Sequence, residues 1–280
     1  MTDSASSRRA LPRAVRAVLA VLGRGALALT VLLGTGLGVG LVSALGRPAP
    51  APQAAPPPER EIAPADVRPG ADAPGGAQPE PTSEEEGGDG GDPVRQWADR
   101  VAAVVDVPSR ALVSYVRADL AMRRRQPDCR VDWATLAGIG RVESNHGRYG
   151  GRRLGADAVP SNPIIGVPLD GSEDVRAITD TDGGALDGDP VHDRAVGPMQ
   201  FIPSTWAKWS TDGNADGVGD PHNLDDAAMA AARYLCAGGR DMRTGEGWWN
   251  GILSYNNSVS YARKVFALAE SYAEAGQRRQ

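Results

Sequence analysis

The sequence has few of the residues on which several kinds of binding site depend. Among its 280 residues are only two Phe, two Cys and three His. A zinc site needs Cys or His ligands at short, regular spacings, and these scattered residues match none of them. The formal net charge is −5, so the chain also lacks the basic face that nucleic-acid binding requires.

Positive charge is concentrated at the N-terminus. Six arginines and one aspartate give residues 1–47 a charge of +5, which leaves −10 on the rest of the chain. Residues 25–46 carry no charged side chain, and as a helix they would extend about 33 Å, enough to cross a hydrocarbon core of about 30 Å. We predict a basic cytoplasmic segment at 1–24 and a transmembrane anchor at 25–46. The alternative is a cleaved signal peptide, and both place the following residues outside the cytoplasm.

Residues 47–91 have the composition of a linker. Pro-Ala runs give way to an acidic, glycine-rich stretch, and large apolar side chains are scarce. Burial of apolar surface would therefore not offset the entropy lost on ordering this segment. We predict a flexible spacer between the membrane and a folded domain.

Residues 92–275 show the apolar periodicity of a mainly helical domain. Asp92 and Pro93 form a helix start, and further helices are expected after Pro108, Asp132, Pro203 and Leu224 and near the C-terminus. The Gly-, Asp- and Pro-rich stretch 147–193 predicts a long loop with a short strand at 163–169. The expected fold is mainly α, with a small irregular β-containing insert and a tail at 276–280.

The two cysteines, Cys129 and Cys236, both lie in the predicted exported part. An isolated pair in an oxidising compartment is expected to form a disulfide. The alternative is two buried free thiols.

Three short motifs contain side chains suited to chemistry on a glycan. The first is Glu143-Ser144-Asn145-His146-Gly147, in which Glu143 ends an apolar helix. Partial desolvation there would raise its pKa above the ordinary value of about 4.3, as protonation of a glycosidic oxygen requires. The second motif, Gly197 to Trp206, offers the amide of Gln200 and the ring of Phe201, with Trp206 expected in the core. The third contains Tyr255 and Asn256 at a helix end.

The order of these motifs resembles the lytic murein transglycosylases over about residues 93–273, most closely the membrane-bound B type found in actinobacteria. This resemblance implies a lysozyme-like fold related to goose-type lysozyme, with Glu143 as the catalytic acid and base. It also implies that Tyr255 lies close to the Glu143 carboxyl. The residues that would contact the glycan are Ser144, Gln200, Phe201, Tyr255 and Asn256.

The resemblance further implies a reaction without water. The β-1,4 bond between N-acetylmuramic acid and N-acetylglucosamine breaks, and the muramic C6 hydroxyl closes a 1,6-anhydro ring. One carboxyl group suffices for this chemistry, whereas an ordinary glycosidase needs two. In the alternative interpretation Asp193 is a second carboxylate and the enzyme is a hydrolysing muramidase. We expect Asp193 instead to be a hydrogen-bond acceptor that positions the Gly197 loop.

Residues 212–218 reproduce the first half of an EF-hand loop. Position 12 is Asn223 rather than Glu, but the B-type resemblance implies an elongated loop that ends on Asp226. We predict a structural calcium ion and no organic cofactor, with an aspartate turn without an ion as the alternative. The expected ligands are Asp212, Asn214, Asp216, the Val218 carbonyl and Asp226, with Asp220 contributing through water. Asp180 and Asp182 are interpreted as turn residues.

These inferences place the protein in the cell envelope, either anchored or secreted. Its expected partners are peptidoglycan glycan strands, the membrane through the N-terminal anchor, and a cell-wall synthesis or division complex, but not nucleic acid. Two other functions fit parts of the sequence. One is a non-catalytic peptidoglycan-binding module on a membrane tether, and the other is a calcium-triggered signalling protein.

Overall fold

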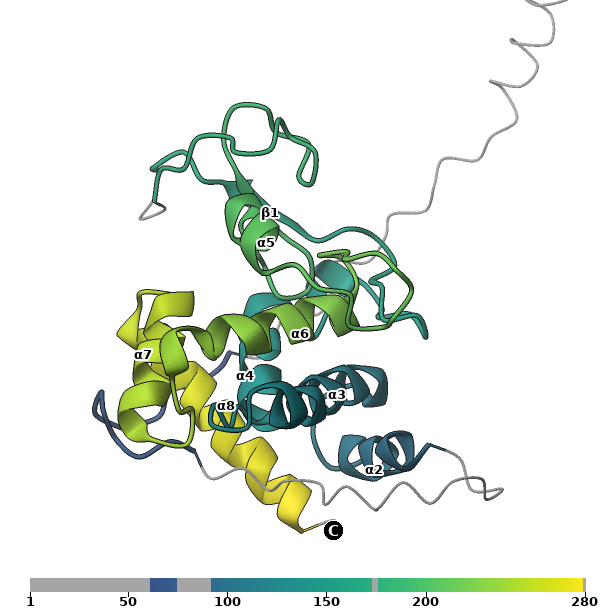
Figure 1. Cartoon of the computed structure of the whole chain (residues 1–280), viewed down its shortest axis with the longest axis vertical. Helices are drawn as coiled ribbons and strands as arrows, with labels where there is room; N and C mark the ends of the chain where they lie inside the picture. The colour runs from purple at the N-terminus through teal and green to yellow at the C-terminus, as the bar shows by residue number, and fades with distance from the viewer. Residues whose placement is uncertain (1–60, 75–91, 173–175, 279–280) are drawn as a thin grey trace, which may run out of the picture. The chain divides into compact units, whose positions relative to one another are not determined.

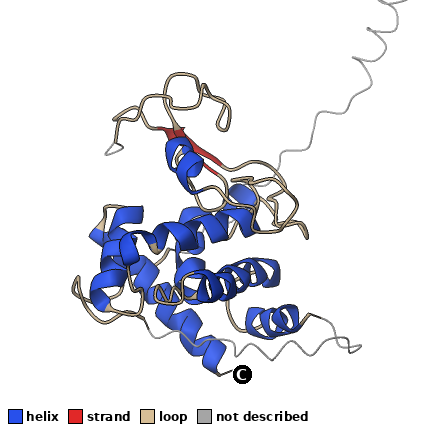
Figure 2. Cartoon of the chain, in the orientation of Figure 1, coloured by secondary structure: helices blue, strands red, loops and turns tan. Residues whose placement is uncertain are grey.

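The computed structural model describes residues 61–74, 92–172 and 176–278. This part of the chain is mainly helical with one small antiparallel sheet (Figure 2), which confirms the predicted fold class. The helices are α2 (Pro93–Ala102), α3 (Ser109–Arg125), α4 (Trp133–Ser144), α5 (Pro203–Trp209), α6 (Leu224–Leu235), α7 (Gly245–Tyr255) and α8 (Val259–Gln277), with short 3-10 turns at Tyr149–Gly151 and Ala237–Gly239. The strands are β1 (Ile165–Pro168) and β2 (Arg194–Val196).

Helix α4 runs through the core and carries the first motif at its C-terminal end. Its residues from Trp133 to Arg141 are buried, and it packs mainly against α8. Asp132 caps its start by accepting the Thr135 N–H at 2.7 Å. The helix ends where Asn145 and His146 both adopt positive φ angles. The apolar character of α4 therefore buries most of the helix, while its last turn reaches the edge of the core.

A buried ion pair joins α3 to α6. The Arg110 guanidinium binds both carboxylate oxygens of Asp225, and the Ser114 hydroxyl donates to the same carboxylate at 2.7 Å. Asp225 is only 7% exposed, so loss of one partner would leave an uncompensated buried charge, at a cost of about 3–5 kcal/mol. The pair therefore holds the two helices in register.

The β-containing insert lies above α6 in Figure 1, beside α5, whereas α3, α4 and α8 lie below α6. Strand β1 pairs antiparallel with β2, with Ile165 opposite Val196. Asp193, which precedes β2, is fully buried and accepts the Thr181 N–H and hydroxyl, both at 2.8 Å. Asp193 is thus a structural acceptor, as one of the two sequence interpretations expects, but its side-chain partner is Thr181 rather than a residue of the Gly197 loop. Asp180 accepts the N–H groups of residues 182–184, which confirms its turn role.

The two cysteines form the predicted disulfide. Cys129 and Cys236 are bonded, with their Cα atoms 5.4 Å apart and a sequence separation of 107. The bond connects the segment before α4 to the C-terminal end of α6. It therefore closes a loop that contains α4, α5 and α6.

Two predicted domain boundaries differ from the structure. Residues 61–74 fall in the predicted linker, yet the Ala65 N–H donates to the Arg263 carbonyl of α8 and the Trp249 indole donates to the Ala71 carbonyl. The prediction of a flexible spacer is wrong for these residues because backbone groups and small apolar side chains can dock without a large hydrophobic surface. Helix α8 also continues to Gln277, so the predicted tail begins two residues too early.

No helix within residues 61–74, 92–172 and 176–278 combines the length and the apolar character needed to cross a membrane. The basic segment 1–24 and the anchor predicted at 25–46 lie outside the described residues.

We predict that replacing both Cys129 and Cys236 with Ser lowers the free energy of unfolding by about 4–5 kcal/mol, because the unfolded chain then regains the entropy of a loop of about 100 residues. Urea denaturation of the oxidised protein and of the double variant measures the difference. A reducing agent should destabilise the original protein and leave the variant unchanged. Equal stability of the oxidised protein and the variant would contradict the prediction.

Candidate active site

Glu143 stands in the last turn of α4 with a half-buried carboxyl group. Its Oε1 atom accepts the Tyr261 hydroxyl at 2.5 Å, and Tyr261 lies in the first turn of α8. Burial raises the pKa of Glu143 to about 7, against the lowering effect of the Tyr261 hydrogen bond. This pKa lies close to neutral pH, so the group can both donate and accept a proton there.

Tyr255 is not the hydrogen-bond partner of Glu143, although the family resemblance implies that it lies beside this carboxyl. Its hydroxyl donates to the Met199 carbonyl at 2.7 Å. Burial first, and then the charge of Glu143, raise the pKa of Tyr255 well above its ordinary value, so the two groups do interact electrostatically. The direct partner, Tyr261, was missed at the sequence level. The cap residue Ser258, whose hydroxyl accepts the Tyr261 N–H, was the available signal.

Ser144 is buried and faces the protein interior rather than a cleft. It is 1% exposed, its hydroxyl donates to the Pro198 carbonyl at 2.6 Å, and it accepts the Gly147 N–H at 2.8 Å. Its expected role as a substrate contact is therefore wrong. Ser144 instead joins the end of α4 to the loop that contains Gln200.

The Gln200 loop is shaped by its backbone. Gln200 has a φ of 50° and its side-chain amide donates to the Gly197 carbonyl at 2.9 Å. A side chain at Gly197 would meet the Pro221 carbonyl oxygen at 1.8 Å, so only glycine fits there. Gln200 remains half-buried next to this turn, where its carbonyl oxygen can still accept a hydrogen bond.

Phe201 is also a core residue and not a surface for a sugar. It is 2% exposed and packs edge-on against Trp206 and Tyr255, with ring centroids 5.5 and 5.9 Å apart. The expectation that Phe201 contacts substrate is wrong, whereas the core position expected for Trp206 is confirmed. Phe201 therefore packs between Tyr255 and Trp206.

A row of half-buried aromatic rings extends from Tyr255 through Tyr234 to Trp209. Successive ring centroids are 5.5 and 5.7 Å apart, and the Tyr234 hydroxyl donates to the Ser254 carbonyl at 2.6 Å. Asn256, at the C-terminal end of α7, is exposed beside this row. The sequence motifs did not identify Tyr234 or Trp209 because the two residues come from α6 and α5 and meet only in the folded chain.

Among the described residues, no second carboxylate shifts the pKa of Glu143. In the described part of the chain, its pKa is shifted by burial and by Tyr261 alone. Asp193, the candidate for a second catalytic carboxylate, accepts hydrogen bonds from Thr181 with both of its oxygens. Within residues 61–74, 92–172 and 176–278, Glu143 is therefore the one acid–base group that we identify at this site.

Residues 212–226, here called the acidic loop, begin with a turn in which side-chain oxygens accept nearby backbone N–H groups. Asp212 accepts the N–H groups of Asp216 and Gly217, Asn214 accepts that of Asp216, and Asp216 accepts that of Val218. These oxygen donors suit calcium chemically.

Asp226 closes the acidic loop from its far end. It is fully buried and accepts the N–H groups of Gly213, Asn214 and Asp220 at 2.7, 3.3 and 2.9 Å. The carboxylates of the loop are not gathered as closely as a bound ion would draw them. Among the described residues, only Asp180, Asp182 and Asp193 bring three carboxylate oxygens within 4.8 Å of one another, and those accept backbone and hydroxyl hydrogen atoms.

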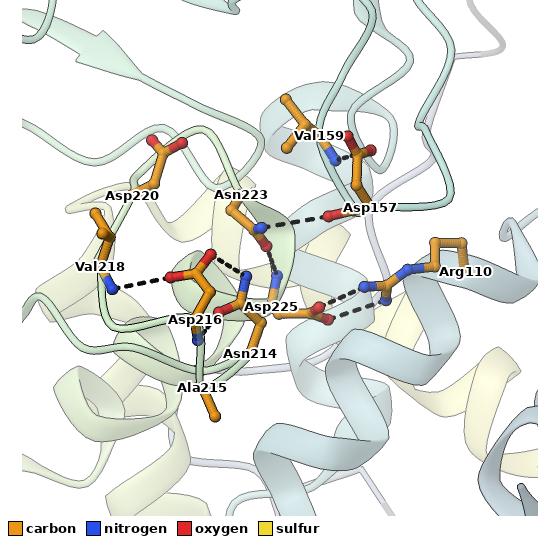
Figure 3. A pocket seen from close by; sticks show the side chains of 10 residues that line it. All are labelled: Arg110, Asp157, Val159, Asn214, Ala215, Asp216, Val218, Asp220, Asn223 and Asp225. Carbon is orange, nitrogen blue, oxygen red and sulfur yellow. Dashed lines mark hydrogen bonds and ion pairs between the residues drawn. The ribbon is translucent and has the colours of Figure 1, made fainter.

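A cavity of about 500 Å³ lies beside the acidic loop (Figure 3). The Arg110–Asp225 ion pair lies on one side of it, and the Asn223 amide reaches the Asp157 carbonyl at 3.3 Å. Glu143 is not among the residues that line it. The cavity therefore belongs to the acidic loop rather than to the acid–base group.

Residues 193–250 match the transglycosylase SLT domain. This segment contains Gln200, the acidic loop and the aromatic pair Tyr234 and Trp209. Glu143 and Tyr255 lie outside it. No curated protein matches the chain.

Solved structures of lytic transglycosylases are similar to the chain at low sequence identity. Slt35 of Escherichia coli in complex with bulgecin A has a TM-score of 0.39 and 15% identity over 65% of this chain and 79% of its own. Slt35 in complex with calcium has a TM-score of 0.39 and 16% identity over 65% and 80%. SltB3 from Pseudomonas aeruginosa in complex with NAG-NAM-pentapeptide has a TM-score of 0.35 and 20% identity over 66% and 68%.

We predict that Glu143→Gln stabilises the fold above neutral pH and has little effect near pH 4. The pKa of Glu143 is about 7 in the folded chain and about 4.3 when unfolded, so ionisation opposes folding increasingly as the pH rises from 4 to 7. The gain at pH 8 should be on the order of 1–3 kcal/mol, because partial exposure reduces the effect. Urea denaturation at pH 4 and pH 8 measures it. The exposed Glu270→Gln serves as the control, and a pH-independent difference would contradict the prediction.

Proposed function

We propose that this protein is a peptidoglycan lytic transglycosylase. It cleaves the β-1,4 bond between N-acetylmuramic acid and N-acetylglucosamine and leaves 1,6-anhydromuramyl ends. The observation that carries the proposal is a half-buried carboxyl group, Glu143, with a pKa of about 7 that no second carboxylate of the described residues shifts. The match of residues 193–250 to the transglycosylase SLT domain supports it.

A single group with this pKa suits both proton transfers of the reaction. Protonated Glu143 donates to the glycosidic oxygen as the bond from that oxygen to muramic C1 breaks. The resulting carboxylate then takes the proton of the C6 hydroxyl as its oxygen bonds to C1. Glu143 thus regains its proton, and no water is consumed. Tyr261 holds Oε1, which leaves Oε2 to exchange the proton.

The aromatic row offers a path for the glycan on one side of Glu143. Tyr255, Tyr234 and Trp209 present half-buried rings with polar edges, which suit sugars because a pyranose has both apolar and hydroxyl-bearing faces. Asn256 and Gln200 would add amide hydrogen bonds to the sugar acetamido groups. Ser144 and Phe201 would support the site from inside.

The other parts of the proposal concern location. We place the protein in the cell envelope, held by an anchor at 25–46 or secreted, as a B-type enzyme of cell-wall remodelling. A growth or division complex would direct it to its substrate.

A structural calcium ion belongs to the same proposal. Asp212, Asn214, Asp216, the Val218 carbonyl and Asp226 would hold it, and its charge would offset the repulsion among these carboxylates. It would stabilise the acidic loop, which contacts the Gln200 turn where Gly197 meets Pro221.

Digestion of purified peptidoglycan tests the activity. We expect soluble fragments whose muramyl ends are lighter by one water than hydrolysis products, detected by mass spectrometry. Glu143→Gln should lower the rate by about 10²–10⁴-fold, whereas Glu270→Gln should retain it. If all fragments carry reducing ends, the enzyme is a hydrolysing muramidase and not a transglycosylase. Asp193→Asn should then abolish the release of fragments. Saturable binding to peptidoglycan without release of soluble fragments would indicate a non-catalytic binding module.

Calcium depletion tests the metal site. A chelator should lower the melting temperature and calcium should restore it, because an ion at 100 times its dissociation constant stabilises the folded chain by about 2.7 kcal/mol. For a domain of this size, that corresponds to roughly 5–10 °C. Asp212→Asn should weaken the response. Identical melting curves with chelator and with calcium would contradict the proposed calcium site.

A further inference from the structure

Residues 61–74, here called the N-terminal clamp, are tied to both α7 and α8. The Ala65 N–H donates to the Arg263 carbonyl at 3.1 Å, and the Arg263 guanidinium donates back to the Val67 carbonyl at 2.8 Å. Further along, the Trp249 indole N–H donates to the Ala71 carbonyl at 3.1 Å. These bonds fix the clamp at two separate points, one on each helix.

The sequence of the clamp suits this extended, docked conformation. Its prolines favour an extended backbone, and Arg68-Pro69-Gly70-Ala71 forms a turn in which Ala71 donates to Arg68 at 3.0 Å. Gly70 has a φ of 84°, as the third position of such a turn requires. Small apolar side chains then pack against the core, and they belong to Ala65, Val67 and Ala73.

Helix α7 is shaped to receive the clamp. Its first residue is Gly245, and a Cβ atom there would lie 2.5 Å from the Ala71 carbonyl oxygen and 2.8 Å from that of Gly70. Glycine is otherwise a poor helix residue. The close approach of the clamp backbone explains its presence at this position.

The clamp joins the two helices whose adjoining ends form one side of the candidate active site. Helix α7 ends at Tyr255, and α8 carries Tyr261 two residues before Arg263. Tyr261 can donate to Glu143 only while the start of α8 keeps its place against α4. The contacts of the clamp with Arg263 therefore act on the helical turn that holds Tyr261.

We propose that residues 61–74 are a positioning element of the active site: they hold α7 against α8 and so keep Tyr261 on Glu143. The catalytic consequence rests on the proposed function, but the clamp itself does not. The working domain then includes residues 61–74 as well as the helices from α2 onward.

Substitutions in the full chain test the docking. Ala65→Pro removes the N–H that bonds to Arg263, and Gly245→Ala places a methyl group against the clamp backbone. Each should lower the melting temperature by several degrees. The double variant should lower it no further than the stronger single one, because the loss of either attachment releases the whole clamp. Ala63→Pro, at an exposed clamp position, is the matched control and should have no effect. Additive decreases in melting temperature, or no decrease, would contradict the proposal that the clamp is docked as one unit.

The titration of Glu143 tests the positioning role without relying on activity. The pKa of this carboxyl is lowered by Tyr261 from α8, while the charge of Glu143 in turn raises the pKa of Tyr255 from α7. Loss of the Tyr261 hydrogen bond removes an effect that lowers the Glu143 pKa, so Ala65→Pro should shift the carboxyl NMR titration upward. Tyr261→Phe should give the same shift, and adding Ala65→Pro to it should change nothing more. An unchanged titration in Ala65→Pro would overturn the positioning role.

The rate of glycan cleavage provides a third test of the positioning role. Ala65→Pro should lower the turnover rate several-fold and move the Glu143 limb of the pH–rate profile in the same direction as the NMR titration. Ala63→Pro should leave the turnover rate and the pH–rate profile unchanged. If the unaltered protein releases no fragments, the proposed function fails, while the melting and titration results still decide the clamp.

Discussion

The hydrogen bond from Tyr261 to Glu143 is the interaction on which the candidate site depends. It joins α8 to the last turn of α4 and holds a carboxyl group whose pKa burial raises to about 7. Desolvation disfavours the charged form of the carboxyl group, whereas the hydrogen bond from the phenol favours it. The two effects together bring the pKa close to neutral pH. Elements that keep α8 against α4 therefore act on the chemistry, and the N-terminal clamp is one of them.

Buried polar groups maintain this arrangement because each would be costly to leave unpaired. After Glu143 the chain turns sharply, and Asn145 and His146 both have positive φ angles, which are strained for such residues. His146 is fully buried between the hydroxyls of Tyr115 and Tyr272, at 3.1 and 3.5 Å. Burial lowers its pKa well below the ordinary value, so it stays neutral. This network supports the turn from the core side.

Local signals in the sequence predicted the elements well where the physics is local. The Asp132 cap, the apolar run of α4 and the aspartate turn at Asp180 were all visible in short windows. Predictions failed where a side chain had two plausible environments. Ser144 and Phe201 could face a cleft or the core, and only the packing of α4 against the Gln200 loop decides that they face inward. Residues 61–74 show the reverse, since a linker-like composition conceals a docked segment.

By itself, the sequence determined the mainly helical fold, the Cys129–Cys236 pair and Glu143 as the candidate acid, because periodicity, compartment and motif order are properties of the chain alone. The tertiary structure decided which phenol meets that acid, which aromatic rings form a row, and that residues 61–74 belong to the domain. Those contacts join residues separated by up to 196 positions, as between Val67 and Arg263. Such proximity arises only when the helices pack, so no local pattern encodes it.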